Sequence, residues 1–417
     1  MRKIREFLIY ALPTLLCLDS YCFFYFKTFP VTLSFVAIAL ILVLSVFYIR
    51  KIDMSLLAAF LILLVLIVVC GFFYSFNFTS SLLYVFYFLA FILSRHRFNA
   101  KLYYRGLKSL LFLTTIFSII AIFQMASNFV NIPRLDLIIP NHMVSGYNRY
   151  NLLYFGSSLV IARSNGLFLE PSFLSQFCVV AFVVAITLYK ENLIKKPTMI
   201  ISIILNALGL LFSFAGTGIL LLLIFIVIYW FKNKRSFAGL YVVIGLVFVG
   251  LIALLALPAN LKDYLLSRIV EVGDNQKSGG MRFSYPYYMV FDTLFYQVFG
   301  FGCGNESLAM SQFYPQMVEM SDKLASGYAK IGVELGVLGL AILLIAIFKC
   351  EKRKDVYLFT FLLLINVLGG NLLNTYFWGF MLFLNYDVAK VTYPAVETAK
   401  NDSSNVEPIT PQKEVAI

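Results

Sequence analysis

The sequence predicts an all-α protein that crosses a membrane about twelve times. Of its 417 residues, 61% are hydrophobic and 13% are charged, whereas soluble domains carry about 25% charged residues. The mean hydropathy is +0.87. Apolar runs recur along the chain, and many reach the ~20 residues that a helix needs to cross ~30 Å of hydrocarbon. A soluble globular, disordered or fibrous protein is excluded.

Twelve apolar runs are candidate membrane spans. The final two are separated only by Asn374-Thr375-Tyr376, so a single bent element is the alternative for them. We expect one transmembrane domain over residues 1–390 and a polar, disordered cytoplasmic tail over 391–417. The runs are 6–26, 31–49, 55–74, 80–94, 109–130, 172–189, 199–214, 218–231, 237–257, 328–348, 356–374 and 375–389.

The basic residues predict the orientation of the chain. The formal net charge is +12, but most Lys and Arg residues flank apolar runs, which indicates membrane topology rather than nucleic-acid binding. Cytoplasmic segments carry an excess of Lys and Arg. With the N-terminus inside, 23 of the 33 basic residues are cytoplasmic. We therefore expect both chain termini in the cytoplasm.

Two connections on the predicted outer side are much longer than the others. The first covers residues 131–170 and the second covers residues 258–327. Long loops in compact proteins are usually functional. The spans hold few polar side chains, so we look for chemistry in these two loops.

The first outer loop ends in Arg163-Ser164-Asn165-Gly166, followed by Glu170-Pro171. Proline suits the first turn of a helix, which places Glu170 at a helix N-terminus. In the structural interpretation, Glu170 caps the helix and Arg163 snorkels to the lipid headgroups. In the functional interpretation, the Arg163 guanidinium binds a phosphate at the membrane surface.

The second outer loop contains Ser278-Gly279-Gly280-Met281-Arg282, and an aromatic, amphipathic segment begins at Tyr285. Such a segment is typical of an interfacial helix, and its aromatic faces also suit stacking on sugar rings. Farther along, Gly300-Phe301-Gly302-Cys303-Gly304 is interpreted as a tight turn. It is not a dinucleotide site, because no strand–helix unit surrounds it.

Several kinds of catalytic site are excluded by the residue inventory. The chain has two histidines and six scattered cysteines, with no CxxC pair. It also has no HExxH motif, no Walker lysine loop and no nucleophile elbow. We therefore expect no metal site, no cofactor and no Ser-His-Asp machinery.

Taken together, these segments resemble the bacterial O-antigen polymerase (Wzy) and O-antigen ligase superfamily of membrane glycosyltransferases. The resemblance covers roughly residues 100–375. It is carried by the order and placement of five short motifs. These are Arg163-x-x-Gly166-x-x-x-Glu170-Pro171, Ser213 to Gly216-Thr217-Gly218, Gly280-x-Arg282, Gly300-x-Gly302-x-Gly304-Asn305 and Glu334-Leu335-Gly336-Val337-Leu338-Gly339.

The resemblance implies a GT-C-like fold in the bacterial inner membrane, with both long loops in the periplasm. The implied reaction moves a glycan from an undecaprenyl-diphosphate carrier to a hydroxyl of a lipid-linked acceptor. It uses neither metal nor cofactor and inverts the anomeric centre. In the ligases a histidine precedes the late Glu-Leu-Gly segment. Residues 323–328 of this chain hold none, which favours a polymerase of O-antigen repeat units for lipopolysaccharide.

The implied reaction assigns roles to the candidate residues. Arg163 and Arg282 stabilise the departing diphosphate, and Glu170 is the general base, with Asp292 and Glu334 as alternatives. Expected partners are the lipid-linked repeat units, membrane lipids, a chain-length regulator and a flippase, but no nucleic acid. The residues expected to bind substrate are Arg268, a third candidate cation for the diphosphate, with Asn165, Tyr285, Tyr288, Tyr328 and Glu334.

Three alternative functions remain open at this point. An O-antigen ligase uses the same donor and transfers it to lipid A-core. A transporter or flippase of lipid-linked glycans also fits twelve spans, but transporters place charges or broken helices near the midplane and often show inverted repeats. The sequence has few such charges and no detectable repeat. The third alternative is a scaffold of the export machinery.

Overall fold

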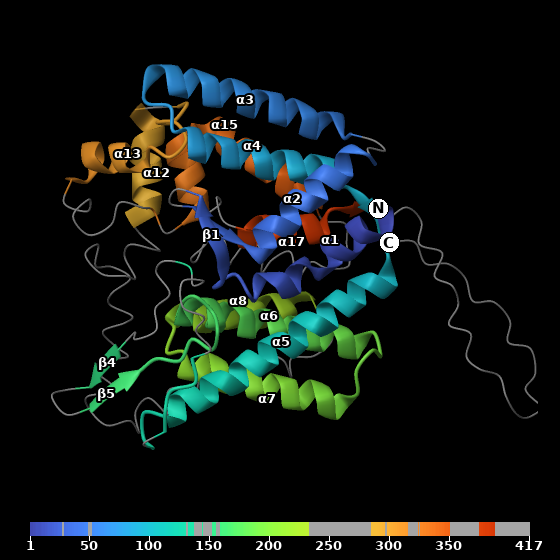
Figure 1. The fold of residues 1–417 in the computed structure, drawn as a ribbon. Coiled ribbons are helices and arrows are strands. Elements are labelled where there is room, and N and C mark those ends of the chain that lie inside the picture. The colour runs from blue at the N-terminus through green and yellow to red at the C-terminus, as the bar shows by residue number, and fades with distance from the viewer. Residues whose placement is uncertain are drawn as a thin grey trace, which may run out of the picture.

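The protein is mostly helical, and most of its longer helices lie side by side in roughly one direction, whereas α12 (Tyr285–Tyr296) stands across them (Figure 1). The computed structural model describes residues 1–26, 29–48, 52–130, 132–136, 144, 152–155, 159–232, 285–296, 298–315, 324, 326–350 and 375–387. The predicted spans 237–257 and 356–374 and the predicted tail 391–417 lie outside these residues.

Most described helices overlap the predicted apolar runs, but α5 (Ala100–Ala126) begins nine residues before the predicted span 109–130 and ends four residues before its end. The first helices are α1 (Arg2–Leu16), α2 (Leu33–Val46), α3 (Met54–Phe73), α4 (Phe78–Leu93) and α5 (Ala100–Ala126). The later helices are α6 (Pro171–Lys190), α7 (Lys196–Phe212), α8 (Gly216–Lys232), α12 (Tyr285–Tyr296), α13 (Glu306–Phe313), α15 (Gly327–Cys350) and α17 (Thr375–Leu384). Short strands β1 (Cys22–Phe26), β2 (Phe29–Thr32), β3 (His96–Arg97), β4 (Leu152–Phe155), β5 (Leu159–Ala162) and β6 (Tyr386–Asp387) form three two-stranded pairs.

Four described helices, α3, α5, α6 and α15, are long and apolar enough to cross a membrane. Shorter apolar helices accompany them, among them α2, α4, α7 and α17. This confirms the expectation of a helical membrane protein. The number of spans and their orientation stay predictions.

The first predicted span, residues 6–26, is wrong in its second half. Helix α1 ends at Leu16, the chain turns, and β1 then pairs with β2 in an antiparallel hairpin. The turn places the Asp19 carboxylate where it accepts hydrogen bonds from the hydroxyls of Ser34 and Thr375. A buried carboxylate requires such partners, and a continued helix would remove Asp19 from them.

The last predicted span, residues 375–389, is also too long. Helix α17 ends at Leu384 and is followed by β6, which pairs in parallel with β3. All ten residues of α17 are buried. The Trp378 ring stacks on Tyr87 of α4, with 5.9 Å between ring centroids. Helix α17 therefore lies inside the bundle and packs against α4.

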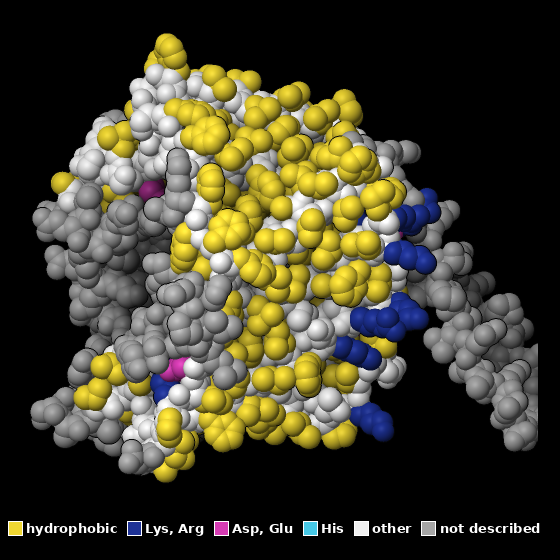
Figure 2. Space-filling view, in the orientation of Figure 1, with side chains coloured by type: hydrophobic (Ala, Val, Ile, Leu, Met, Phe, Trp, Pro, Cys, Tyr) yellow, Lys and Arg dark blue, Asp and Glu magenta, His cyan; other side chains and the backbone are white. Residues whose placement is uncertain are grey.

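The two ends of the bundle differ in character. Figure 2 shows Lys and Arg side chains gathered at one end, beside the start of α1, and an apolar surface between the ends. At the basic end Lys349 of α15 contacts the Asp53 carboxylate at 2.9 Å. Burial alone would raise the pKa of Asp53, but hydrogen bonds from Ser55 and Lys349 outweigh it and hold that pKa well below its usual range. The described parts of both predicted outer loops lie at the opposite end (Figure 1).

Helix α15 is interrupted at Gly336, in the first half of the helix. Gly336 has φ 64° and ψ −156°, which no α-helix contains. A Cβ at this position would lie 1.9 Å from the carbonyl oxygen of Val298. The predicted span 328–348 therefore consists of two helical pieces, and the break receives a segment from the second outer loop.

Candidate functional site

The side chain of Arg163 holds the turn between α7 and α8. Its Nε donates a hydrogen bond to the carbonyl oxygen of Ser213 at 2.9 Å, and its Nη2 donates to the carbonyl oxygen of Phe214 at 3.1 Å. Phe214 has a positive φ of 47°, a conformation that costs energy for a residue with a side chain. At least two guanidinium nitrogens of Arg163 thus fix the local backbone.

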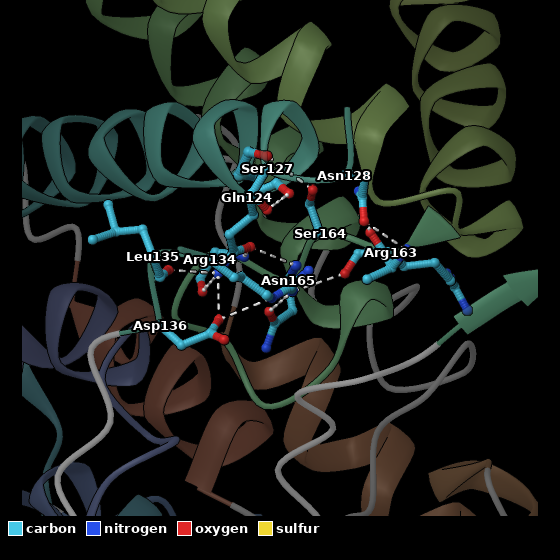
Figure 3. Close-up of polar contacts among 12 residues, drawn as sticks. Gln124, Ser127, Asn128, Arg134, Leu135, Asp136, Arg163, Ser164 and Asn165 are labelled. Carbon is cyan, nitrogen blue, oxygen red and sulfur yellow. Dashed lines mark hydrogen bonds and ion pairs between the residues drawn. The ribbon is translucent and has the colours of Figure 1, made fainter. Parts of the chain in front are cut away.

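The backbone after Arg163 is fixed by the buried amide of Gln124 in α5 (Figure 3). Gln124 Oε1 accepts the N–H groups of Asn165 and Gly166 at 3.1 and 2.9 Å. Its Nε2 donates to the carbonyl oxygens of Gly166 and Leu135 at 2.8 and 3.0 Å. Gly166 has φ 58°, and a Cβ there would lie 2.8 Å from the carbonyl oxygen of Phe117. The positive φ and the close approach of Phe117 explain why the Arg163 motif has a glycine at position 166.

Arg134 is a component of this site that sequence reasoning did not select. Its Nη2 donates to the carbonyl oxygen of Arg163 at 2.9 Å and to Asn165 Oδ1 at 3.1 Å. Its Nε forms an ion pair with Asp136 at 3.1 Å. Arg134 therefore joins two parts of the first outer loop. The only sequence signal was an Arg two residues before an Asp, which is common.

Asn165 was predicted to bind substrate. The residue is fully buried, and its Nδ2 donates to the carbonyl oxygen of Phe168 at 2.8 Å. Its Oδ1 accepts from Arg134. Both polar atoms of the side chain are thus engaged within the protein. In Figure 3 the Arg163 side chain extends away from this network.

Glu170 directly precedes α6, as the sequence predicted. Pro171 occupies the first helical position, and the carbonyl oxygen of Glu170 accepts from Leu174 N–H. The Glu170 carboxylate accepts a hydrogen bond from Ser172 Oγ at 3.0 Å and is partly exposed. It also lies within electrostatic range of the Tyr376 hydroxyl. Because it is partly exposed, the Glu170 carboxylate is accessible to a hydroxyl group from outside the protein.

The Ser213 to Gly218 turn packs on the start of α6. Ser175 Oγ lies 3.4 Å from Thr217 Oγ1, and a Cβ on Gly218 would lie 2.4 Å from the Ser175 Cβ. Arg163 also donates two hydrogen bonds to this turn. The segment that begins at Arg163 and the Ser213 to Gly218 turn are therefore in contact, although they are distant in the sequence.

The glycine-rich loop is joined to the broken helix in a similar way. Phe301 N–H donates to the carbonyl oxygen of Val333 at 2.9 Å, and Gly302 N–H donates to that of Glu334 at 2.8 Å. Gly300, Gly302 and Gly304 all have positive φ, which confirms the predicted tight turn. The break in α15 frees these carbonyls, and the loop satisfies them.

A buried ionic cluster lies beside this contact. Lys330 pairs with Glu306 and, at 3.4 Å, with Glu334. The Tyr84 hydroxyl donates to Glu334 Oε2 at 2.7 Å, and Leu324 N–H donates to Glu306 Oε2 at 2.9 Å. Glu334, a predicted substrate-binding residue and alternative base, is thus enclosed in the protein and fully buried.

The remaining predicted residues differ in exposure. Tyr285 is fully buried, Tyr288 is 59% exposed, and Tyr328 is partly buried against the main core. Arg268 and Arg282 lie outside the described residues, so the expected meeting of Arg163 with Arg282 stays a prediction. Within the described ranges, no group of three or more His, Cys, Asp or Glu side chains could hold a metal ion.

Comparison with known proteins does not assign the chain to a family: no protein-family model matches it, and no curated protein matches it by sequence. Function must therefore be inferred from the motifs and from the contacts that join them.

Proposed function

We propose that the protein is a polysaccharide polymerase of the inner membrane, acting on O-antigen repeat units. It transfers a glycan from an undecaprenyl-diphosphate carrier to a hydroxyl of a second lipid-linked repeat unit on the periplasmic side. The proposal is supported by the pairing of four motifs at one end of an apolar bundle. The Arg163–Pro171 segment joins the Ser213 turn, and the Gly300 loop joins the Glu334–Gly336 break.

The observation that carries the proposal is the fixed position of Arg163. Its Nε and Nη2 are bound to backbone carbonyls, and the segment behind it is held by Gln124. The cationic group is therefore oriented before any ligand arrives. Catalysis depends on charges that are already placed where charge develops in the transition state. A lipid-linked diphosphate would be placed at this end, where its lipid lies among the apolar helices.

The proposed reaction is a direct displacement at the anomeric carbon. The acceptor oxygen forms the new glycosidic bond as the bond from the anomeric carbon to the diphosphate oxygen breaks. The electron pair leaves on the diphosphate, where Arg163 and Arg282 stabilise the negative charge. Each charge-assisted contact contributes about 1.5–3 kcal/mol. Glu170 takes the proton of the acceptor hydroxyl, and the configuration inverts.

Reconstitution of the full-length protein tests the proposal. The purified protein is incubated with undecaprenyl-diphosphate-linked repeat units, and polymer length is followed on gels. We expect Glu170→Gln to lower the rate at least about 100-fold, because a general base contributes at least that factor. Glu191→Gln, at the other end of α6, is the matched control and should keep full activity. Full activity of Glu170→Gln would remove Glu170 from the mechanism.

Two variants of Arg163 distinguish its hydrogen bonds to the Ser213 and Phe214 carbonyls from its positive charge. These are Arg163→Lys and Arg163→Ala. A lysine keeps the charge but not the fork that binds two carbonyls. We expect Arg163→Ala to lose activity and Arg163→Lys to keep only a small part of it. In cells, deletion of a polymerase leaves single repeats on the lipopolysaccharide core, whereas deletion of a ligase leaves none. The second outcome would replace the polymerase with a ligase.

A further inference from the structure

Helix α12 presents two opposite faces at the end of the bundle that holds Arg163. Tyr285 and Met289 are fully buried in a small core with α13 and α15. On the other side, Tyr288 is 59% exposed and Phe291 is 71% exposed. The exposed face therefore presents aromatic rings, although the helix is firmly packed behind them.

A carboxylate lies beside these rings. Asp292 is four residues after Tyr288, so the two side chains lie on the same face of the helix. The Tyr314 hydroxyl donates a hydrogen bond to Asp292 Oδ2. Burial, and then the contact with Asp292, raise the pKa of Tyr314 to about 12, so this phenol keeps its proton near neutral pH. In the described part of the chain, Asp292 forms no ion pair.

The arrangement is rigid. The Tyr285 ring meets Tyr314 edge-on, with 4.8 Å between ring centroids. Behind the helix, the Val290 side chain lies 3.0 Å from where a Cβ would stand on Gly332 of α15. Tyr314 holds one oxygen of the Asp292 carboxylate, which fixes the orientation of the group. Sites that are pre-organised in this way bind a ligand with a smaller entropic cost.

We propose that Tyr288 and Asp292, with Tyr314 orienting the carboxylate, bind a sugar ring of the glycan substrate. A pyranose has an apolar face of C–H groups, which stacks on an aromatic ring, and hydroxyl groups at its edge, which donate to a carboxylate. The Tyr288 ring offers the stacking surface and Asp292 offers the acceptor. The choice of a glycan as the ligand rests on the proposed function.

The charge of this surface restricts the kind of sugar. Asp292 has no cationic partner among the described residues, and such a carboxylate attracts hydroxyl and ammonium groups and repels carboxylates. The subsite therefore suits a neutral or amino sugar and disfavours a uronic acid. Phe291 widens the apolar surface beside Tyr288 and suits a second ring of the same chain.

The experiment measures binding without catalysis. Oligosaccharide repeats are released by partial hydrolysis from the surface polysaccharide of the producing cells and added to the full-length protein in nanodiscs. Saturation transfer from protein to sugar ring protons is recorded by NMR, and affinity is measured by titration. Galacturonic acid oligomers serve as the acidic probe. Leu308→Ala is the matched control, because Leu308 is an exposed apolar residue on neighbouring α13.

We expect Tyr288→Ala to weaken binding at least tenfold and Tyr288→Phe to keep it, since stacking needs only the ring. Asp292→Asn should weaken binding several-fold and reduce the discrimination against the acidic probe. Leu308→Ala should bind like the unmodified protein. Unchanged binding in both Tyr288→Ala and Asp292→Asn would overturn the inference, as would absence of binding by the unmodified protein.

The result is independent of the polymerisation assay. If the protein polymerises repeats and Tyr288→Ala binds them unchanged, the proposed function stands and the subsite is wrong. If Tyr288→Ala weakens binding but the protein does not polymerise repeats, the subsite stands and the proposed function is wrong. Tyr288→Phe, which should fold and bind normally, guards against misreading a folding defect in Tyr288→Ala.

Discussion

The backbone N–H of Gly302 donates a hydrogen bond to the carbonyl oxygen of Glu334 at 2.8 Å. This contact joins the glycine-rich loop to α15 at its break. Phe301 makes an equivalent bond to Val333, and Val337 N–H donates to the carbonyl oxygen of Val298 at 3.2 Å. The loop and the helix thus replace the hydrogen bonds that an unbroken helix would contain.

Replacement of Gly336 by alanine should destabilise the protein strongly. The native φ of 64° and ψ of −156° lie in a region that essentially only glycine adopts, which costs another residue about 1–3 kcal/mol, and the added Cβ would lie 1.9 Å from the Val298 carbonyl oxygen. We expect a total loss above about 2 kcal/mol, measured by unfolding in detergent. Gly216→Ala is the control, because no atom lies within 4 Å of a Cβ there. Equal stability of the two variants would contradict the role given to the break.

Replacement of Lys330 by methionine should destabilise the protein by about 3–5 kcal/mol, because it leaves two carboxylates buried without a cation. Lys330 is paired with Glu306 and Glu334, and its side chain is 4% exposed. Lys349→Met is the matched control. Its side chain is 39% exposed and pairs with Asp53, and such surface pairs contribute about 0–1 kcal/mol.

Adding Glu306→Gln and Glu334→Gln to Lys330→Met should restore part of the lost stability. Neutral amides still accept the hydrogen bonds from Leu324 N–H and the Tyr84 hydroxyl. If the triple variant is no more stable than Lys330→Met alone, unpaired charge is not the cause of the loss.

Stability should fall on mild acidification because of His96 in β3. Burial, with the positive charge of Arg5 nearby, lowers the pKa of His96 to about 3, whereas an unfolded histidine titrates near pH 6.5. The unfolded state therefore binds the proton first, and stability declines as pH falls from about 6.5 toward 3. The expected loss between pH 7.5 and pH 5.5 is about 1.4 kcal/mol. Chemical unfolding at the two pH values measures it.

His96→Phe provides the comparison for the pH effect. Phenylalanine fills a similar volume and does not titrate, so this variant should lack the component of the pH dependence that His96 causes. The ring contacts of His96 with Tyr10 and Tyr386 are of a kind that a phenyl ring also makes. An identical pH dependence in the two proteins would assign the effect to other groups.

Three of the four long apolar helices could be predicted from the sequence to within a residue or two, whereas α5 begins nine residues before the predicted span 109–130 and ends four residues before its end. The predicted spans 55–74 and 172–189 correspond to α3 and α6, because a continuous apolar run of bilayer length has few alternatives. The first span was wrong because the partners of Asp19 come from remote positions. Nothing near residue 19 reveals that Ser34 and Thr375 will meet its carboxylate.

The site could be predicted only as separate pieces. The position of Glu170 before α6 follows from Pro171, a local signal. The binding of Arg163 to the α7–α8 turn, the role of Arg134 and the enclosure of Glu334 depend on contacts between distant segments. A pattern of residue types identifies a polar side chain, but it does not reveal which remote group will engage that side chain.

The reciprocal fit of Gly300 and Gly336 has an evolutionary consequence. A methyl group on Gly300 would collide with the backbone of Glu334 and Leu335, and one on Gly336 would collide with Val298 and Gly300. Neither position can acquire a side chain unless the glycine-rich loop moves away from the break in α15. Descendants of a common ancestor should therefore preserve both glycines for as long as they keep this contact between the loop and the helix.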